Sequence, residues 1–187
     1  MKSKSSAMMV AAALALCALP AAAQERGFYA GLSVGQSTAN GACDGIGGAG
    51  VSCDDSSNTW KLFGGYQVNR HFAAELGYSD QLAKASASGP GGTAQVKVSA
   101  WELVAVPSYP ITDQFSVYGK AGLYYATSKG TSSAGASASE TDNGLTFGLG
   151  AGYQITKNVG ARLEWQRYND VGGPNIDALN LGVLYRF

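Results

Sequence analysis

The feature that most constrains this chain is an alternation of side chains with a period of two residues. From Phe28 onward, large apolar residues alternate with small or polar ones in eight separate stretches. A period of two indicates β-strands, and a length of about ten residues suits a strand that crosses a bilayer at a tilt. The stretches are 28–35, 60–68, 72–79, 96–109, 115–125, 145–153, 159–166 and 179–187.

One face of nearly every stretch is aliphatic or aromatic, and the other carries glycine, serine and the charged residues. Leu163 and Trp165 share one face, for example, while Arg162 and Glu164 share the other. A soluble barrel would place the apolar face inside, but the interior of a barrel with eight strands is narrow and suits small residues. The oily face therefore points to lipid. We predict an all-β fold, an eight-stranded antiparallel up-and-down transmembrane β-barrel.

The stretch 96–109 alternates less regularly than the others. Val96, Val98 and Ala100 begin on one face, but Trp101 and Leu103 start the better apolar set after them. We therefore expect a β-bulge or a change of register near Ala100.

The connections between the stretches support the same topology. Residues 69–71, 110–113 and 156–158 are tight turns, whereas 38–58, 80–94, 127–144 and 170–176 are long or rich in glycine and serine. Short and long connections alternate strictly, as in outer-membrane barrels with short periplasmic turns and longer extracellular loops. Four long loops and three short turns require eight strands, with both termini on the short side.

The N-terminus has the layout of a secretory signal peptide. Lys2 and Lys4 precede an apolar stretch over 7–19, and small residues at 21–23 offer a cleavage site before Gln24. We expect residues 1–23 to be removed and 24–187 to form one outer-membrane β-barrel domain. Cys17 does not indicate a lipoprotein signal, because the bulky Leu16 precedes it where a small residue is needed.

Composition excludes two further classes of protein. The formal charge is zero and no basic cluster is present, so nucleic acid is not an expected partner. No apolar run of about 18 residues follows the leader, which excludes a helical membrane protein.

Several short motifs, in their order and spacing, resemble the OmpA-like transmembrane domain family of small eight-stranded outer-membrane barrels. They are GGYQVN (64–69), ELGY (75–78), YPITD (109–113), GYQIT (152–156), RLEW (162–165) and LYRF (184–187). The resemblance covers essentially the whole mature chain and implies a barrel in the outer membrane of a Gram-negative bacterium. It does not fix one activity. Many members append a peptidoglycan-binding domain, but this chain stops at its last strand, so we do not expect wall anchoring.

The resemblance also implies two partners for this chain, the lipid of the outer membrane and the outer-membrane assembly machinery. The closing alternation with a final aromatic, at Tyr185 and Phe187, is similar to the signal that this machinery recognises.

Charged residues on the inward face are the most informative polar residues of the sequence. In lipid they would each cost several kcal/mol, so we expect them to compensate one another inside. They are Glu75, Glu102, Lys120, Arg162, Glu164 and Arg186.

In the resembling family an acid–base cluster plugs the lumen. Glu75 and Arg162 match its acid and its arginine, but Val106 and Gly152 stand where the pattern expects a lysine and a second acid. Two interpretations therefore stay open, a sealed ionic core and a slightly leaky barrel.

The first long loop carries two cysteines, Cys43 and Cys53. The chain folds in an oxidising compartment, so we expect a disulfide that closes this loop. Asp44, Asp54 and Asp55 lie nearby, but their spacing matches no calcium-binding loop, and we predict no metal and no cofactor.

The sequence contains no recognisable arrangement of catalytic residues. Some small outer-membrane barrels modify lipids, but the only histidine, His71, lies in an expected periplasmic turn without a serine and an acid around it. We expect no enzyme activity. The sequence favours a structural role or the presentation of surface loops to an unknown ligand, with a narrow pore for small solutes as the alternative.

Overall fold

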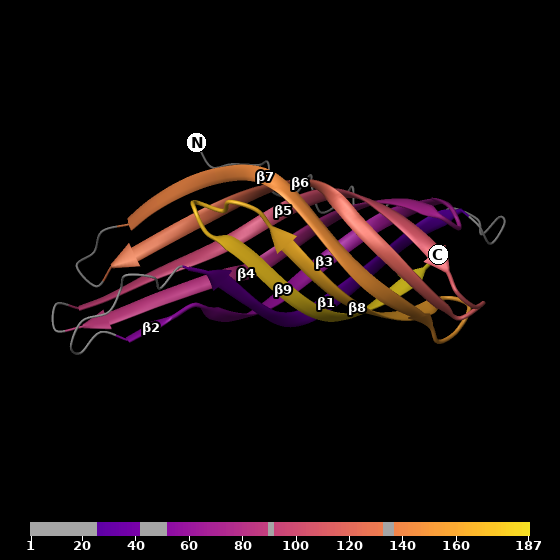
Figure 1. Ribbon diagram of the computed structural model, residues 1–187, viewed down its shortest axis with the longest axis horizontal. Helices are drawn as coiled ribbons and strands as arrows, with labels where there is room; N and C mark the ends of the chain where they lie inside the picture. Colours follow the sequence, from indigo (N-terminus) through magenta and orange to yellow (C-terminus); the bar gives the residue numbers. More distant parts are fainter. Residues whose placement is uncertain (1–25, 42–51, 90–91, 133–136) are drawn as a thin grey trace, which may run out of the picture.

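The computed structural model describes residues 26–41, 52–89, 92–132 and 137–187. The chain forms one antiparallel sheet in the order β2-β4-β3-β1-β9-β8-β7-β6-β5, and the pairing of β4 with β5 closes it into a barrel (Figure 1). The strands are β1 (Gly27–Asn40), β2 (Ser52–Asp54), β3 (Ser56–Asn69), β4 (Phe72–Gly89), β5 (Gly92–Pro110), β6 (Phe115–Ser132), β7 (Ser137–Gln154), β8 (Val159–Tyr168) and β9 (Asn175–Arg186). Eight strands form the closed wall, and the short β2 is an extension beside the outer part of β4.

The predicted sense of the alternation is confirmed. Leu103 is 60% exposed on the outer surface, whereas its neighbour Glu102 is 2% exposed inside the barrel. The same inversion recurs on β8, where Leu163 is exposed between the buried Arg162 and Glu164. Large apolar side chains thus cover the outside of the wall, as lipid requires.

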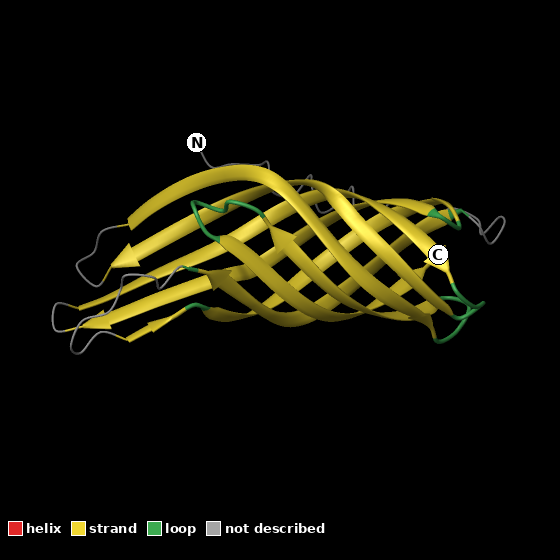
Figure 2. Cartoon of the chain, in the orientation of Figure 1, coloured by secondary structure: helices red, strands yellow, loops and turns green. Residues whose placement is uncertain are grey.

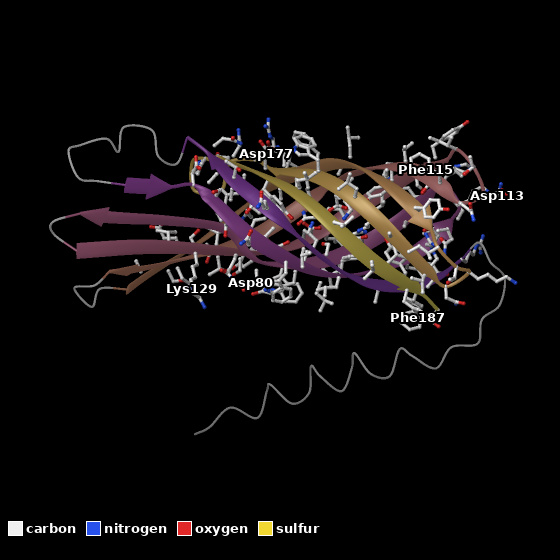
Figure 3. All side chains as sticks on the ribbon, turned by 90° about the horizontal axis from the view of Figure 1, so that it is seen from below. Asp80, Asp113, Phe115, Lys129, Asp177 and Phe187 are labelled. Atoms are coloured by element: carbon white, nitrogen blue, oxygen red, sulfur yellow. The ribbon has the colours of Figure 1, made fainter. Side chains whose placement is uncertain are left out.

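Aromatic side chains mark two levels on this outer surface. Trp60, Trp101, Tyr125 and Trp165 form a loop-side girdle, and Tyr66, Phe72, Tyr109, Phe115 and Phe187 form a turn-side girdle. Figure 3 shows Phe115 and Phe187 toward one end of the barrel and Lys129 toward the other. Such girdles sit at the two membrane interfaces, because aromatic rings favour the headgroup level.

The short turns lie where we predicted them, and side-chain oxygens hold two of them. Thr112 Oγ1 accepts hydrogen bonds from the backbone amides of Gln114 and Phe115, at 3.3 and 2.9 Å. Thr156 Oγ1 does the same for the amides of Asn158 and Val159, at 3.3 and 3.0 Å. The repeated Ile-Thr pair therefore encodes the same turn twice.

The long loops that we expected over 80–94 and 127–144 are largely strands. β4 and β5 continue pairing as far as Gly89 and Gly92, and β6 and β7 continue as far as Thr131 and Ser137. Figure 2 shows these hairpins projecting from one end of the barrel, with only short connections at the other. Glycine, serine and alanine there suggested loops, but cross-strand hydrogen bonding extends the ladders through them.

The change of register that we expected near Ala100 is present, and the extra residues that cause it lie on the opposite strand. β5 alternates without interruption, with Val98 and Ala100 inside and Trp101 outside. The irregularity falls in β4 between Ser79 and Ala83, where Gln81 has a φ of 51°. With the extra residues, β4 buries two consecutive side chains, Leu82 and Ala83, in one cluster with Val98 and Ala100 of β5.

Within the described ranges, no helix is long and apolar enough to cross a membrane. The expected signal peptide, residues 1–23, and Cys43 lie outside the residues that the structure describes.

Candidate functional site: the charged barrel interior

Six charged side chains meet in the middle of the barrel, and we call them the ionic core. All six are buried, and three are acidic and three are basic. They are Lys61, Glu75, Glu102, Lys120, Arg162 and Glu164. They project from β3, β4, β5, β6 and β8, so this one cluster connects five of the eight wall strands.

Glu75 forms the turn-side half of the ionic core. Arg162 donates two hydrogen bonds to it, from Nη1 to Oε2 at 2.8 Å and from Nη2 to Oε1 at 3.2 Å. Lys120 also pairs with Oε1, and the Tyr29 hydroxyl donates to Oε2 at 3.0 Å. Both oxygens of this buried carboxylate are therefore occupied by two cations and one phenol.

Glu164 and Lys61 link this half to the loop-side half. Glu164 Oε2 receives Lys120 Nζ at 2.8 Å and the Tyr118 hydroxyl at 3.1 Å. Lys61 Nζ donates to Glu164 Oε1 at 3.2 Å and to Glu102 Oε1 at 3.1 Å. Each lysine thus bridges two acids, which balances the buried charge.

Neutral polar side chains donate hydrogen bonds to the second carboxylate oxygen of Glu102. Gln166 Nε2 donates to Glu102 Oε2 at 2.9 Å and to Thr146 Oγ1 at 2.8 Å, and the Tyr168 hydroxyl also donates to Glu102 Oε2. Gln166 offers its own carbonyl oxygen to Lys61. A buried charge is tolerated only when its hydrogen bonds are made, and these groups make those of the Glu102 carboxylate.

Two tyrosine rings reach the core because glycines face them. An added Cβ at Gly150 would lie 2.3 Å from Tyr118 Cζ, and one at Gly65 would lie 2.4 Å from Tyr29 Cζ. Neither clash could be relieved without moving a ring that holds an acid. Some of the 26 glycines of the chain therefore make room for interior side chains.

An apolar cluster closes the lumen on the loop side of the ionic core, and we call it the loop-side plug. It consists of Ala39, Leu82, Ala83, Val98, Ala100, Tyr124, Ala126, Tyr168, Val171, Ile176 and Ala178. We did not predict this cluster from the sequence, because we expected small residues and charges throughout the interior. Beyond the loop-side girdle the barrel interior is thus largely apolar, with Ser37 and Ser57 also buried there.

The turn-side half of the lumen is open. A cavity of about 950 Å³, which we call the turn-side cavity, reaches from the turn residues Thr112 and Lys157 inward to Arg162 and Gly152. Phe63 lies near its inner end, and the Arg162 guanidinium carbon is 3.3 Å from the centre of the Phe63 ring. The cavity therefore ends at the ionic core.

The structure brings together five of the six interior charges that we named from the sequence, Glu75, Glu102, Lys120, Arg162 and Glu164. It adds Lys61, whose inward position the alternation of 60–68 already indicated. Arg186 does not join them. It lines the turn-side cavity and makes no ion pair within the described ranges.

The remaining predicted positions are not part of this cluster. Tyr185 and Phe187 lie exposed on the outer surface, with their rings 5.2 Å apart. His71 is exposed in a turn, and its Nδ1 lies 3.3 Å from the carbonyl oxygen of Ser108. No group of histidine, cysteine, aspartate or glutamate side chains within the described residues could hold a metal ion. Because Cys43 is not described, the expected disulfide with Cys53 stays a prediction.

An ion pair lies on the outside of the wall, beyond the loop-side girdle. Arg167 Nε donates to Asp177 Oδ1 at 2.7 Å, and Asn40 Nδ2 donates to Asp177 Oδ2 at 2.7 Å. The hydrogen bond from Arg167, together with its charge, holds the pKa of the Asp177 carboxyl below its ordinary value.

Known proteins share this sequence pattern and this architecture. Residues 9–187 match the family described as Outer membrane protein beta-barrel domain. Outer membrane protein A of Klebsiella pneumoniae is 37% identical over 137 residues, which are 67% of this chain and 40% of that protein. Outer membrane protein P5 of Haemophilus influenzae is 31% identical over 221 residues, covering all of this chain and 61% of that protein.

A solved structure shows the same fold at low sequence identity. Neisserial surface protein A superposes with a TM-score of 0.63 at 17% identity, covering 86% of this chain and 97% of that one. This chain spans 40% and 61% of the length of the two curated relatives above. The chain belongs to the outer membrane protein β-barrel domain family and is a protein of the Gram-negative outer membrane.

Proposed function

We propose that this protein is a structural barrel that presents its loop-side hairpins at the cell surface and does not conduct solutes. The observation that carries the proposal is the filled lumen. The ionic core and the loop-side plug occupy it in succession, so the turn-side cavity is blind.

The hairpins themselves support presentation. Along β5 the outward residues change from Leu103 and Trp101 to Ser99 and Lys97, and along β6 they change from Tyr125 to Thr127 and Lys129. A polar outer face no longer suits lipid, so these parts of the strands leave the membrane. They offer a rigid, strand-paired surface to a ligand outside the cell.

This role involves two partners, the membrane lipid and the assembly machinery, and no catalysed reaction. Lipid surrounds the apolar wall, and the assembly machinery inserts the chain by its closing strand, with Tyr185 and Phe187 as the signal. Residues 1–23 direct export and are removed. The described interior charges are all engaged with one another or line a blind cavity, which favours a structural role over an enzyme.

A deletion strain tests this proposal when it is complemented by two genes. One encodes the parent, and the other has the paired ends of the β4–β5 and β6–β7 hairpins replaced by short turns. We expect both to restore resistance of the envelope to detergent, and only the parent to restore attachment of cells to host-cell or matrix surfaces. Attachment that is equal with both genes would contradict presentation, and a deletion strain with an intact envelope would contradict the structural role.

A further inference from the structure

The turn-side cavity carries an excess of positive charge. Among its described lining residues, the cationic side chains are those of Arg26, Arg70, Lys157, Arg162 and Arg186, whereas Asp113 has the one acidic side chain. Two of these cations sit within the barrel itself, Arg162 at the inner end and Arg186 nearer the mouth. The mouth lies at the end of the barrel with the short turns, which faces the periplasm in this family.

Arg162 has a hydrogen-bond donor to spare. Its Nη1 and Nη2 engage Glu75, but its buried Nε–H has no hydrogen-bond partner in the part of the chain that the structure describes. The side chain is 5% exposed, and the residue lines the cavity. A buried donor on a cation without an acceptor is costly, so an anionic acceptor in the cavity would stabilise it.

The residue that faces Arg162 on β7 supplies no such acceptor. Gly152 lies directly opposite Arg162 in the pairing of β7 with β8, and both line the cavity. An added Cβ at Gly152 would have Ser116 Oγ at 3.1 Å as its nearest neighbour. Ser116, which pairs with Gly152 between β6 and β7, also lines the cavity.

Arg186 provides a second, unneutralised charge on the path inward. It projects into the lumen from β9 opposite Tyr29, and it is half-buried without an ion-pair partner among the described residues. Partial burial strengthens its attraction for an anion, because less water screens the charge. An anion that enters from the turn side therefore meets Arg186 before Arg162.

We propose that the turn-side cavity is a binding site for a small soluble anion that carries a carboxylate or phosphate group, with Arg162 Nε–H as the buried donor and Arg186 as the attracting charge. The ligand comes from the aqueous phase, because the cavity opens among the turns at the end of the barrel and the closed wall separates it from lipid. The site is independent of the surface role of the hairpins.

Nuclear magnetic resonance of the refolded full chain in a non-ionic detergent tests this directly. The side-chain Nε–Hε resonance of Arg162 is followed while inorganic phosphate, and separately acetate, is added at constant ionic strength set with sodium chloride. We expect a saturable shift of that resonance with at least one of the two anions. The absence of a saturable shift with both would overturn the proposal.

Two variants and a matched control sharpen the test. Arg186→Gln should weaken binding about tenfold, the effect of losing one charge-assisted interaction. Arg167→Gln removes the same charge from the outer wall and should leave the affinity unchanged. Gly152→Asp should abolish binding, because its carboxylate occupies the Arg162 donor from the facing strand. Equal effects of Arg186→Gln and Arg167→Gln, or unchanged binding in Gly152→Asp, would overturn the site. Retained heat-modifiable migration on SDS gels shows that each variant is folded.

Measurements in nanodiscs distinguish a lipid headgroup from a soluble anion as the ligand of the turn-side cavity. Phosphate should bind equally in discs of phosphatidylcholine alone and in discs that contain phosphatidylglycerol. Competition by phosphatidylglycerol would overturn the soluble source.

Discussion

Arg162 on β8 and Glu75 on β4 form a bidentate ion pair across the interior of the barrel, with nitrogen–oxygen distances of 2.8 and 3.2 Å. Three strands, β3, β1 and β9, separate them on one side of the wall. The pair therefore joins opposite sides of the barrel. Its planar, two-point geometry suits arginine and could not be made by lysine.

This pair should be measurable as a coupling energy. In a double-mutant cycle with Glu75→Gln and Arg162→Met, urea unfolding in lipid should give a coupling of about 1 kcal/mol or more. The loss for each single variant should stay below the roughly 3 to 5 kcal/mol typical of a broken buried pair, because Lys120 and Glu164 remain as partners. A coupling energy indistinguishable from zero would show that the two residues do not depend on each other.

Lys61 should matter more to stability than its absence from our sequence-based cluster suggests. Lys61→Met leaves Glu102 with only the longer ion-pair contact to Lys120, at 4.0 Å, and we expect the free energy of unfolding to fall by about 3 kcal/mol. Lys129→Met is the matched control on the exposed outer face, where a change within about 0.5 kcal/mol is expected. Similar losses from the two lysine variants would contradict the central position of Lys61.

The outer ion pair should give the protein a specific acid sensitivity. The folded pKa of Asp177 is below its ordinary value because Arg167 donates to the carboxylate, so the pair stabilises the folded state above that ordinary value. This stability is lost as the pH falls through the ordinary pKa, near 4, toward the folded one. Asp177→Asn should therefore flatten the dependence of unfolding free energy on pH in this window. An unchanged pH profile in the variant would exclude Asp177 as a contributor.

The closing residue should affect assembly more than stability. Phe187 is exposed on the outer surface, and its backbone amide pairs with the carbonyl of Phe28 at 3.0 Å. Removing it should lower the yield in the outer membrane severalfold, while the refolded protein keeps nearly its full unfolding free energy. Phe187→Ala and Phe187→Tyr separate the aromatic ring from the backbone contact. Equal yields from all four genes would remove the assembly role.

The sequence predicted the wall far better than the two ends of the lumen. Alternation alone indicated which face of each strand points to lipid, because only one sense places Glu102 and Arg162 away from it. It could not show that β4 and β5 stay paired to Gly89 and Gly92, since the small residues there are equally common in loops. Pairing depends on the partner strand, which local composition does not reveal.

The interior was predictable by position but not by contact. The alternation showed which charged residues point inward. The position of Lys61 between two acids, however, depends on the stagger between β3, β5 and β8. The same stagger places Arg186 in the turn-side cavity and not in the ionic core. The loop-side plug depends on the bulge at Gln81 in β4. The residue pattern of β5 could not show that the bulge lies on β4.

Conductance measures most directly whether the ionic core and the loop-side plug close this barrel. Purified, refolded full chain is added to a planar lipid bilayer, and single-channel current is recorded over a range of voltages, with a heat-denatured sample as the control. A sealed lumen predicts no discrete current steps beyond those of the control. Reproducible steps from the folded parent protein would contradict the sealed barrel and establish the narrow pore instead.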